Sequence, residues 1–204
     1  MTIALLFPGQ GSQFIGMGKD YYDRYESAKS VYKELDLALN RPLSDLIFSG
    51  SDADISLTTN SQPAIMATSI AILRSIQSEE LIDMNDIKLV AGHSLGEYSS
   101  LVATDSLDFS DAVKLLKVRS EAMQESMPVG TGGMAALIGV SLEQITEILP
   151  ELNKHGKIYI ANDNADGQIV LSGEISAIDY ICNNSKQYKI KRAIKLPVSA
   201  PFHC

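Results

Sequence analysis

The sequence of 204 residues predicts an α/β fold, with a hydrolase-like large domain built on a parallel sheet and an inserted ferredoxin-like small subdomain. Three observations support this prediction. Short apolar runs alternate with helix-like segments up to about residue 128. A Gly-x-Ser-x-Gly turn joins one of these runs to a helix. Beyond that point the order becomes strand, helix, strand, strand, helix, strand. We assign residues 1–128 and 197–204 to the large domain and residues 129–196 to the subdomain.

The large domain begins with a strand and a helix that have clear ends. Residues 3–7 form a short apolar run that Pro8 and Gly9 close, which indicates a buried strand leading into a glycine-rich turn. Residues 21–40 are amphipathic, and Pro42 ends the predicted helix because the residue before a proline disfavours the α region. The later elements are a strand at 87–91 and helices at 95–103 and 110–127.

Between these elements, residues 63–76 are apolar nearly all round. Pro63 suits the first position of a helix, and Asn60 or Ser61 is a possible N-cap. A helix without a polar face belongs in the interior, so we expect this helix to be central and buried.

The subdomain begins where Pro128 and three nearby glycines interrupt the helical pattern. The pattern after this boundary is that of a split β-α-β unit, which is typical of a ferredoxin-like arrangement. The predicted strands are at 134–140, 157–161, 168–171 and 189–196, and the predicted helices are at 142–149 and 175–183.

The composition argues against several classes of protein. The chain carries 25 acidic and 17 basic side chains, for a net charge of −8, so we expect no nucleic-acid partner. Its two cysteines and three histidines have no metal-ligand spacing, so we expect no metal. Its apolar runs are shorter than the ~20 residues needed to span a bilayer, and the N-terminus lacks a signal peptide. We therefore expect a cytoplasmic protein with no membrane partner.

The segment Gly92-His93-Ser94-Leu95-Gly96 is the strongest chemical motif. In a nucleophile elbow, a serine occupies a strained turn between a strand and a helix, and the flanking glycines let the two elements approach. The amide of Leu95 then lies at a helix N-terminus, where it can stabilise an oxyanion. The alternative is an ordinary turn, but the strand before it and the helix after it favour the elbow.

A serine hydroxyl needs a base to become a nucleophile, and histidine is the usual one. His93 is next to Ser94, and the turn directs its side chain elsewhere. His155 lies in a polar loop and is expected at the surface. His203 remains, at the return from the subdomain to the large domain, where sites are common. A structural role for His203 is an equal alternative.

Arg119 lies on the apolar stripe of the predicted helix at 110–127, seven positions after Ala112. Its charge therefore faces inward. A buried guanidinium needs an anionic partner, and its planar fork suits a carboxylate. That partner is either an internal Asp or Glu or a carboxylate on a substrate.

Two further segments have both a functional and a structural explanation. The loop at 9–13 could turn the amide of Gln10 toward a neighbouring site, or it could be a plain turn. Lys189, Lys191 and Lys195 have the even spacing of one strand face. This face could dock an acidic protein, or it could simply be solvated.

Six motifs occur in order along the chain. They are FPGQGSQ at 7–13, QPA at 62–64, GHSLGEY at 92–98, VR at 118–119 followed by MQ at 123–124, GQIV at 167–170 with SG at 172–173, and PVSAPFH at 197–203. Together they closely resemble the malonyl-CoA:acyl carrier protein transacylase family of type II fatty acid synthesis.

The resemblance implies roles for individual residues. Ser94 would carry the malonyl group, and His203 would be its base. The amides of Gln10 and Leu95 would form the oxyanion hole. Arg119 would pair with the malonyl carboxylate, in agreement with its inward-facing position.

The resemblance also implies that Gln62 lines the same pocket and that Phe202 is a weak indication of malonyl selectivity. The substrates would be malonyl-CoA and acyl carrier protein, and no cofactor would be needed. We expect a monomer.

Members of this family continue well past the histidine that His203 matches, which indicates a C-terminally truncated chain. Two alternatives follow from the residues. One is a serine thioesterase or esterase with the same elbow. The other is an inactive fragment that only binds acyl carrier protein.

Overall fold

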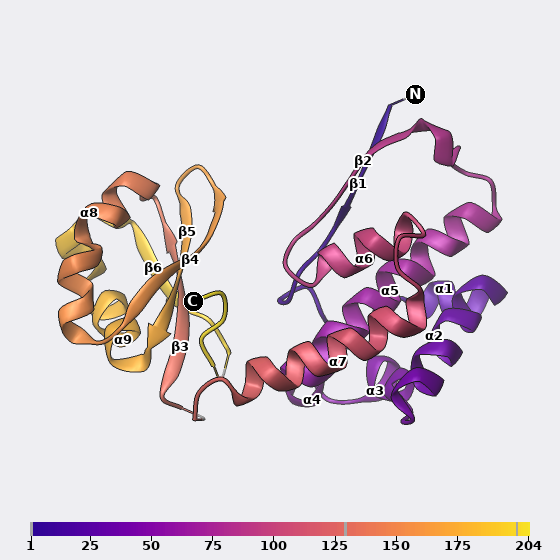
Figure 1. Ribbon diagram of the computed structural model, residues 1–204, viewed down its shortest axis with the longest axis horizontal. Helices are drawn as coiled ribbons and strands as arrows, with labels where there is room; N and C mark the ends of the chain where they lie inside the picture. The colour runs from indigo at the N-terminus through magenta and orange to yellow at the C-terminus, as the bar shows by residue number, and fades with distance from the viewer. Residues whose placement is uncertain (1, 129, 199) are drawn as a thin grey trace. The chain divides into compact units, whose positions relative to one another are not determined.

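The computed structural model describes residues 2–128, 130–198 and 200–204. It has an α/β architecture and divides into two compact units, Met1–Ala122 and Met123–Cys204. In Figure 1 the first unit packs helices beside a pair of strands, and the second is a sheet with two helices on one face.

The first unit is mainly helical. Tyr25, at φ −120° and ψ 126°, splits the helix predicted at 21–40 into two. Two short helices that the sequence analysis did not anticipate follow Pro42. The elements in chain order are β1 (Ile3–Phe7), α1 (Lys19–Arg24), α2 (Glu26–Leu39), α3 (Leu43–Ser49), α4 (Asp52–Ser56), α5 (Thr58–Ser78), the 3₁₀ helix η1 (Met84–Asp86), β2 (Ile87–Gly92), α6 (Gly96–Ala103) and α7 (Phe109–Glu125).

The two strands of this unit are parallel, with Leu5 opposite Val90 and Phe7 opposite Gly92. The amide of His93 donates to the Phe7 carbonyl at 3.0 Å, which carries the pairing one residue beyond β2. Because parallel strands end at the same edge of a sheet, the turn after β1 and the turn after β2 lie side by side.

The two faces of the strand pair differ. The alternation of side chains places Phe7 inward, where it is buried, whereas Leu6 on the other face is 75% exposed. Leu89 on β2 is likewise 57% exposed. An apolar cavity of about 340 Å³ lies between β1 and α5.

The predicted central helix is confirmed as α5, which is buried around most of its circumference. Its start was predicted wrongly, because it begins at Thr58 and Pro63 lies inside it. Proline has no N–H to offer the carbonyl four residues earlier, which is that of Thr59. The guanidinium of Arg41 donates to this carbonyl at 3.1 Å and replaces the missing bond.

The core of the first unit forms where α2 packs against α5. Tyr32 on α2 is fully buried, and its hydroxyl donates to Thr68 Oγ1 on α5 at 3.1 Å. Burial disfavours the phenolate and raises the pKa of Tyr32 to about 12. Other buried core residues are Val31, Leu35, Ile65, Met66, Ile70, Ala112, Val113 and Leu116.

The second unit has the predicted order of strand, helix, strand, strand, helix, strand. Its four strands are all antiparallel, in the spatial order β4-β5-β3-β6. The elements are β3 (Gly132–Ile138), α8 (Leu142–Leu152), η2 (Asn153–His155), β4 (Ile158–Ala165), β5 (Gln168–Glu174), α9 (Ile175–Asn184), η3 (Ser185–Tyr188) and β6 (Arg192–Lys195).

Both helices of the second unit cover the same face of its sheet (Figure 1). A capping box begins α8, in which Ser141 and Gln144 satisfy each other's backbone amides. The core between helices and sheet contains Ala135, Leu137, Ile145, Leu152, Ile158, Ile169, Leu171, Ile178 and Ile181.

The last residues of the chain group with the second unit, whereas the sequence analysis assigned 197–204 to the large domain. Ala200 and Phe202 are buried against Met134 on β3 and Val170 on β5. The division between the units falls after Ala122 rather than at residue 128. The physical reason is the apolar contact of Phe202, which attaches the C-terminal segment to this sheet.

Candidate active site

Ser94 occupies a strained turn between β2 and α6. Its φ is +55°, a left-handed conformation that non-glycine residues rarely adopt. The turn is closed by the Gly96 amide, which donates to the His93 carbonyl at 2.9 Å. Leu95 is the N-cap of α6 and is 1% exposed. This is the geometry predicted for a nucleophile elbow.

The two glycines of the elbow are required sterically. A Cβ added to Gly92 would lie 1.9 Å from the carbonyl carbon of Gly96, and one added to Gly96 would lie 2.5 Å from the carbonyl oxygen of Phe7. Both neighbours are backbone atoms that cannot swing aside. Strand and helix therefore approach too closely at this point for any other residue type.

A third glycine brings the loop after β1 against the elbow. A Cβ on Gly9 would lie 2.4 Å from Nδ1 of His93. The loop is braced internally, since Ser12 Oγ donates to the Gly9 carbonyl at 2.9 Å. The side chain of Gln10 donates to Thr58 Oγ1 at 3.2 Å, so it is held on α5 and does not occupy the turn.

Two backbone amides near Ser94 have no acceptor within the described part of the chain. They are those of Gln10 and Leu95, the pair predicted to form an oxyanion hole. Buried or half-buried backbone amides normally donate a hydrogen bond. Two amides on adjoining turns that have no acceptor in the protein are therefore suited to donate to an oxygen of a ligand. The Leu95 amide also lies at the N-terminus of α6, where the helix dipole favours negative charge.

Arg119 reaches the elbow from α7. Its Nη2 donates to Ser94 Oγ at 2.8 Å, and its Nη1 donates to Gln62 Oε1 at 2.5 Å. Gln62 is fully buried on α5. The structure thus brings together three residues from three helices or turns, and the prediction that Arg119 points inward is confirmed.

The sequence left two possible partners for Arg119, an internal Asp or Glu and a carboxylate on a substrate. The surroundings of Arg119 distinguish between them. Among the described residues, no carboxylate lies within salt-bridge distance of its guanidinium. Burial lowers the pKa of Arg119, while Tyr98 and Glu97 act in the opposite direction. Within the described residues the internal salt bridge is therefore not formed, and the guanidinium donates its hydrogen bonds to the neutral oxygens of Ser94 and Gln62.

Two residues of this site were missed by sequence reasoning. The ring of Tyr98 lies 6.0 Å from the Cζ of Arg119, at cation–π distance. Tyr98 is one helical turn after Ser94, which is the signal that could have identified it. Thr58, which holds the side chain of Gln10, gave no such signal, because α4 and the early start of α5 were not anticipated.

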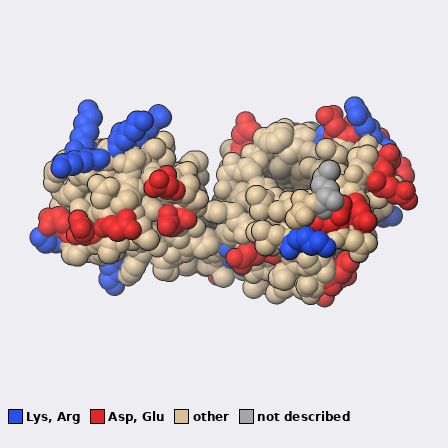
Figure 2. Space-filling view, turned by 90° about the horizontal axis from the view of Figure 1, so that it is seen from above, with Lys and Arg blue, Asp and Glu red and all other residues tan. Residues whose placement is uncertain are grey.

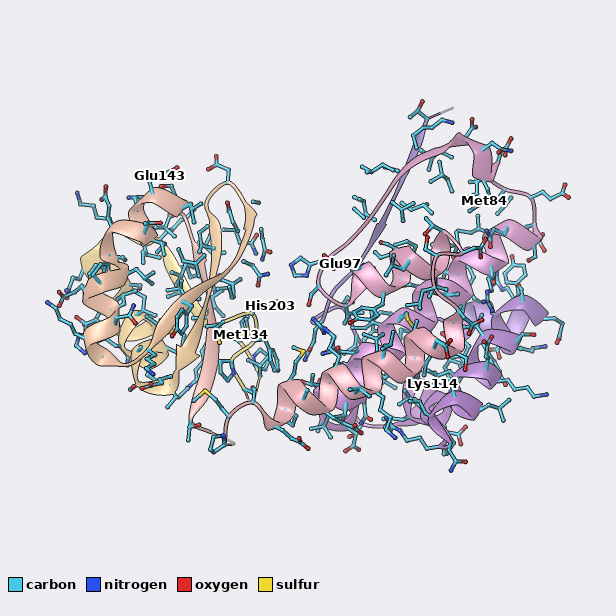
Figure 3. The ribbon with its side chains drawn as sticks, viewed as in Figure 1. Met84, Glu97, Lys114, Met134, Glu143 and His203 are labelled. Carbon is cyan, nitrogen blue, oxygen red and sulfur yellow. The ribbon has the colours of Figure 1, made fainter. Side chains whose placement is uncertain are left out.

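The three histidines lie in different surroundings. His93 is exposed beside Gly9, and His155 stacks on Tyr180 with the ring centroids 3.5 Å apart. His203 belongs to the second unit, where it follows the buried Phe202, has a φ of +59° and is exposed. Figure 3 shows it on the C-terminal segment, and Glu97 at the start of α6 in the first unit. The role of His203 as a base stays a prediction.

Within residues 2–128, 130–198 and 200–204, no group of three or more histidine, cysteine, aspartate or glutamate side chains has the geometry to hold a metal ion. No helix in those ranges is both long enough and apolar enough to cross a membrane.

Comparison with known proteins agrees with this geometry. Residues 4–203 match the family model described as the acyl transferase domain. The malonyl CoA-acyl carrier protein transacylase of Bacillus subtilis (strain 168) is 44% identical over 202 residues, which are 98% of this chain and 62% of that protein. The chain therefore spans less than two thirds of the length of this relative.

Solved structures give the same result. The acyl-carrier-protein-S-malonyltransferase from Bartonella henselae has a TM-score of 0.94 and 47% identity, and the match covers 100% of this chain and 65% of that one. A malonyl-transacylase in complex with a type II PKS acyl-carrier protein has a TM-score of 0.93 and 36% identity, with coverage of 100% and 65%.

Proposed function

The chain belongs to the acyl transferase domain family, and on this premise we propose that it transfers the malonyl group of malonyl-CoA to the phosphopantetheine thiol of acyl carrier protein. The transfer passes through a malonyl ester of Ser94 and serves fatty acid biosynthesis. The relatives named malonyl CoA-acyl carrier protein transacylase support the substrates, and the solved complex with an acyl-carrier protein supports the acceptor.

The position of Arg119 carries this proposal. Its guanidinium lies at hydrogen-bond distance from the oxygen that would be acylated. In a malonyl ester the free carboxylate is attached to the carbon next to the ester carbonyl, so it remains within reach of this guanidinium. An acetyl group offers no carboxylate, and a longer dicarboxylic chain would carry its carboxylate past the fork. The site thus selects a short acyl group with a terminal charge.

In the first half of the reaction, His203 accepts the hydroxyl proton of Ser94 as Oγ attacks the thioester carbonyl. The amides of Gln10 and Leu95 donate to the resulting oxyanion. The C–S bond then breaks, and the departing sulfur of coenzyme A takes the proton from His203. The product is malonyl-Ser94.

In the second half, His203 accepts the proton of the carrier-protein thiol, and the sulfur attacks the ester carbonyl. The C–O bond breaks, and Ser94 Oγ recovers its proton. The malonyl group leaves as a new thioester, so each bond broken is matched by one formed. Arg119 holds the same carboxylate throughout both halves.

The same proposal covers the type of each domain, the location of the protein in the cell, its oligomeric state and its partners. We infer a hydrolase-like large domain on a parallel sheet and a ferredoxin-like subdomain, the latter supported by the strand order β4-β5-β3-β6. The proposed protein is a cytoplasmic monomer that needs no cofactor and binds neither nucleic acid nor a membrane.

Intact-mass measurement of the folded chain after brief mixing with malonyl-CoA tests the proposal. We expect a malonyl adduct that is absent from a Ser94→Ala variant and much weaker with acetyl-CoA. An adduct that disappears in water as fast as it transfers to a thiol would instead indicate a thioesterase. No adduct, with carrier-protein binding retained, would contradict the proposal and indicate a fragment that only binds.

A further inference from the structure

The loop at residues 8–13, directly after β1, carries one of the two amides proposed for the oxyanion hole. Two hydrogen bonds lie inside this loop: the Gly11 amide donates to Gln13 Oε1 at 2.8 Å, and Ser12 Oγ donates to the Gly9 carbonyl at 2.9 Å. Among the described residues, the hydrogen bond that ties the loop to a helix is the one from Gln10 Nε2 to Thr58 Oγ1. The position of the Gln10 amide therefore depends on α5 as well as on β1.

Packing supports this loop on one side only within the described part of the chain. Gly9 packs closely against His93 of the elbow. At Gly11, which has a φ of +107°, nothing lies within 4 Å of an added Cβ, and both Gly11 and Ser12 are exposed. Glycine permits many backbone conformations. The outer half of the loop is therefore not restrained by packing, and the bond from Gln10 to Thr58 is what fastens it.

Thr58 is well placed to hold the loop. It is the first residue of α5 and is 4% exposed. Threonine at the start of a helix often accepts a hydrogen bond from an amide of its own helix, but no side chain caps this end of α5. The buried hydroxyl needs a partner, and it accepts from Gln10 at 3.2 Å instead. This bond joins two segments that are 48 positions apart.

Thr58 shares a face of α5 with Gln62, four positions later. Residues with this spacing lie one above the other, about 6 Å apart along the helix axis. Gln62 accepts a hydrogen bond from the guanidinium of Arg119, just as Thr58 accepts one from Gln10. One face of α5 therefore supports both the loop with the proposed oxyanion donor and the cation proposed to bind the carboxylate.

We propose that Thr58 is a positioning residue, which holds the amide of Gln10 in the oxyanion hole through the side chain of Gln10. This inference rests on the proposed function, in which that amide donates to the oxyanion formed when Ser94 attacks the thioester. Such a donor is effective because it is fixed toward the developing charge before the reaction. Loss of the Thr58 hydroxyl should therefore slow the chemical step without weakening the binding of malonyl-CoA.

A simpler explanation is that the bond between Gln10 and Thr58 only stabilises the fold. A bond of that kind would affect the temperature of unfolding but not the rate at which the folded protein is acylated. The kinetics of folded variants therefore separate the two explanations.

The test uses substitutions that leave the charge unchanged. Thr58→Val removes the acceptor and keeps the shape of the side chain, Thr58→Ser keeps the hydroxyl, and Thr59→Val is the matched control one position along α5. Gln10→Met removes the donor but keeps the backbone amide, and it tests the same bond if Thr58→Val does not fold. The double variant Thr58→Val/Gln10→Met completes a double-mutant cycle. Circular dichroism shows whether each variant is folded.

Two reactions of Ser94 are followed by intact mass. Acylation by malonyl-CoA gives the maximal rate and the half-maximal concentration. Labelling by diethyl fluorophosphate forms a bond between Ser94 Oγ and phosphorus while the P–F bond breaks, and fluoride and the hydroxyl proton leave. The phosphoryl oxygen of this reagent needs the oxyanion hole, but the reagent has no carboxylate. Figure 2 shows acidic side chains on both units, in keeping with the net charge of −8, so a reagent without charge is chosen.

We expect Thr58→Val and Gln10→Met each to lower the maximal rate of malonylation and the rate of labelling about 5- to 30-fold, which is less than the loss of a whole oxyanion donor causes. The half-maximal concentration of malonyl-CoA should stay unchanged. The double variant should be no slower than the slower single variant, because both changes break the same bond. Thr58→Ser and Thr59→Val should react at the rate of the unaltered chain.

Losses that multiply in the double variant, or a normal rate in a folded single variant, would overturn the inference. A higher half-maximal concentration at an unchanged maximal rate would overturn it too, as would slow reaction of Thr58→Ser or an equal loss in Thr59→Val. If neither reagent modified the unaltered chain, no oxyanion hole would be assembled and the inference would be wrong. Labelling that depends on Thr58 and Ser94, without any malonyl adduct, would contradict the proposed function alone.

Discussion

The guanidinium of Arg119 donates a hydrogen bond of 2.8 Å to the hydroxyl oxygen of Ser94, although the two residues lie on different elements and 25 positions apart. In this bond the serine oxygen is the acceptor and the guanidinium is the donor. It also places a fixed positive charge next to the atom that is proposed to carry the acyl group.

Replacement of Arg119 by alanine should slow malonylation of Ser94 about 10- to 100-fold, because a charge-assisted hydrogen bond contributes about 1.5–3 kcal/mol. Acetylation should change much less, since an acetyl group has no carboxylate. Arg119→Lys keeps the charge without the planar fork and should fall in between. Single-turnover measurements with both thioesters give the ratio, and equal losses for malonyl and acetyl groups would contradict a carboxylate clamp.

Replacement of Gln62 by leucine should mainly raise the malonyl-CoA concentration needed for half-maximal acylation, by about 3- to 10-fold, because the guanidinium loses the acceptor that orients it. Gln77→Leu, at the other end of the same helix, is the matched control. A fall in the maximal rate with no change in the half-maximal concentration would show that Gln62 does not act through Arg119.

Alanine at Gly92 should prevent the elbow from forming, because the added methyl carbon would overlap the backbone of Gly96 at 1.9 Å. We expect a loss of unfolding free energy of about 3 kcal/mol or more, since neither element can move away. Gly11→Ala is the contrast. Gly11 has a φ of +107° and open space around it, so only the backbone strain, about 1–2 kcal/mol, is added. Urea unfolding of both variants measures the difference.

The stability of the first unit should fall above about pH 10. Burial raises the pKa of Tyr32 to about 12, whereas an unfolded tyrosine titrates near 10. Between these values the unfolded chain releases a proton that the folded chain keeps, so the contribution of Tyr32 is complete below pH 10. It decreases as pH rises toward 12, by up to about 2.7 kcal/mol for a shift of about two units. Unfolding of Tyr32→Phe between pH 9 and 12 should lack this decrease, and an unchanged slope would assign it to other groups.

Local elements could be predicted from the sequence where several local signals indicate the same structure. The turn at Ser94 was identified because glycines, serine and flanking periodicities agree, and the structure has β2 ending at Gly92 and α6 starting at Gly96. The inward direction of Arg119 followed from helical spacing alone. Leu115, three positions after Ala112 on the same helix, is 47% exposed, so the buried face of this helix is narrow.

Other features depended on contacts that no local pattern encodes. The start of α5 was misplaced because Pro63 lies inside the helix, where the guanidinium of Arg41 donates to the Thr59 carbonyl, and Arg41 is far from Pro63 in the sequence. The register that places Gln10 beside the elbow depends on strand pairing between residues about 85 positions apart. The grouping of the end of the chain with the second compact unit could not be read from the sequence, because burial of Phe202 on β3 and β5 is a tertiary effect.

The parallel pair of β1 and β2 has a consequence for heat inactivation. Gln10 lies in the turn after β1, and Leu95 lies in the turn after β2. Within the described residues these two strands form a two-stranded sheet, and one apolar face of this sheet is exposed to water. A two-stranded sheet is marginal by itself. On warming, the strands should separate locally while the core between α2 and α5 remains intact. The chain would then lose its acylation rate several degrees before its helical circular dichroism declines, and cooling would restore the rate.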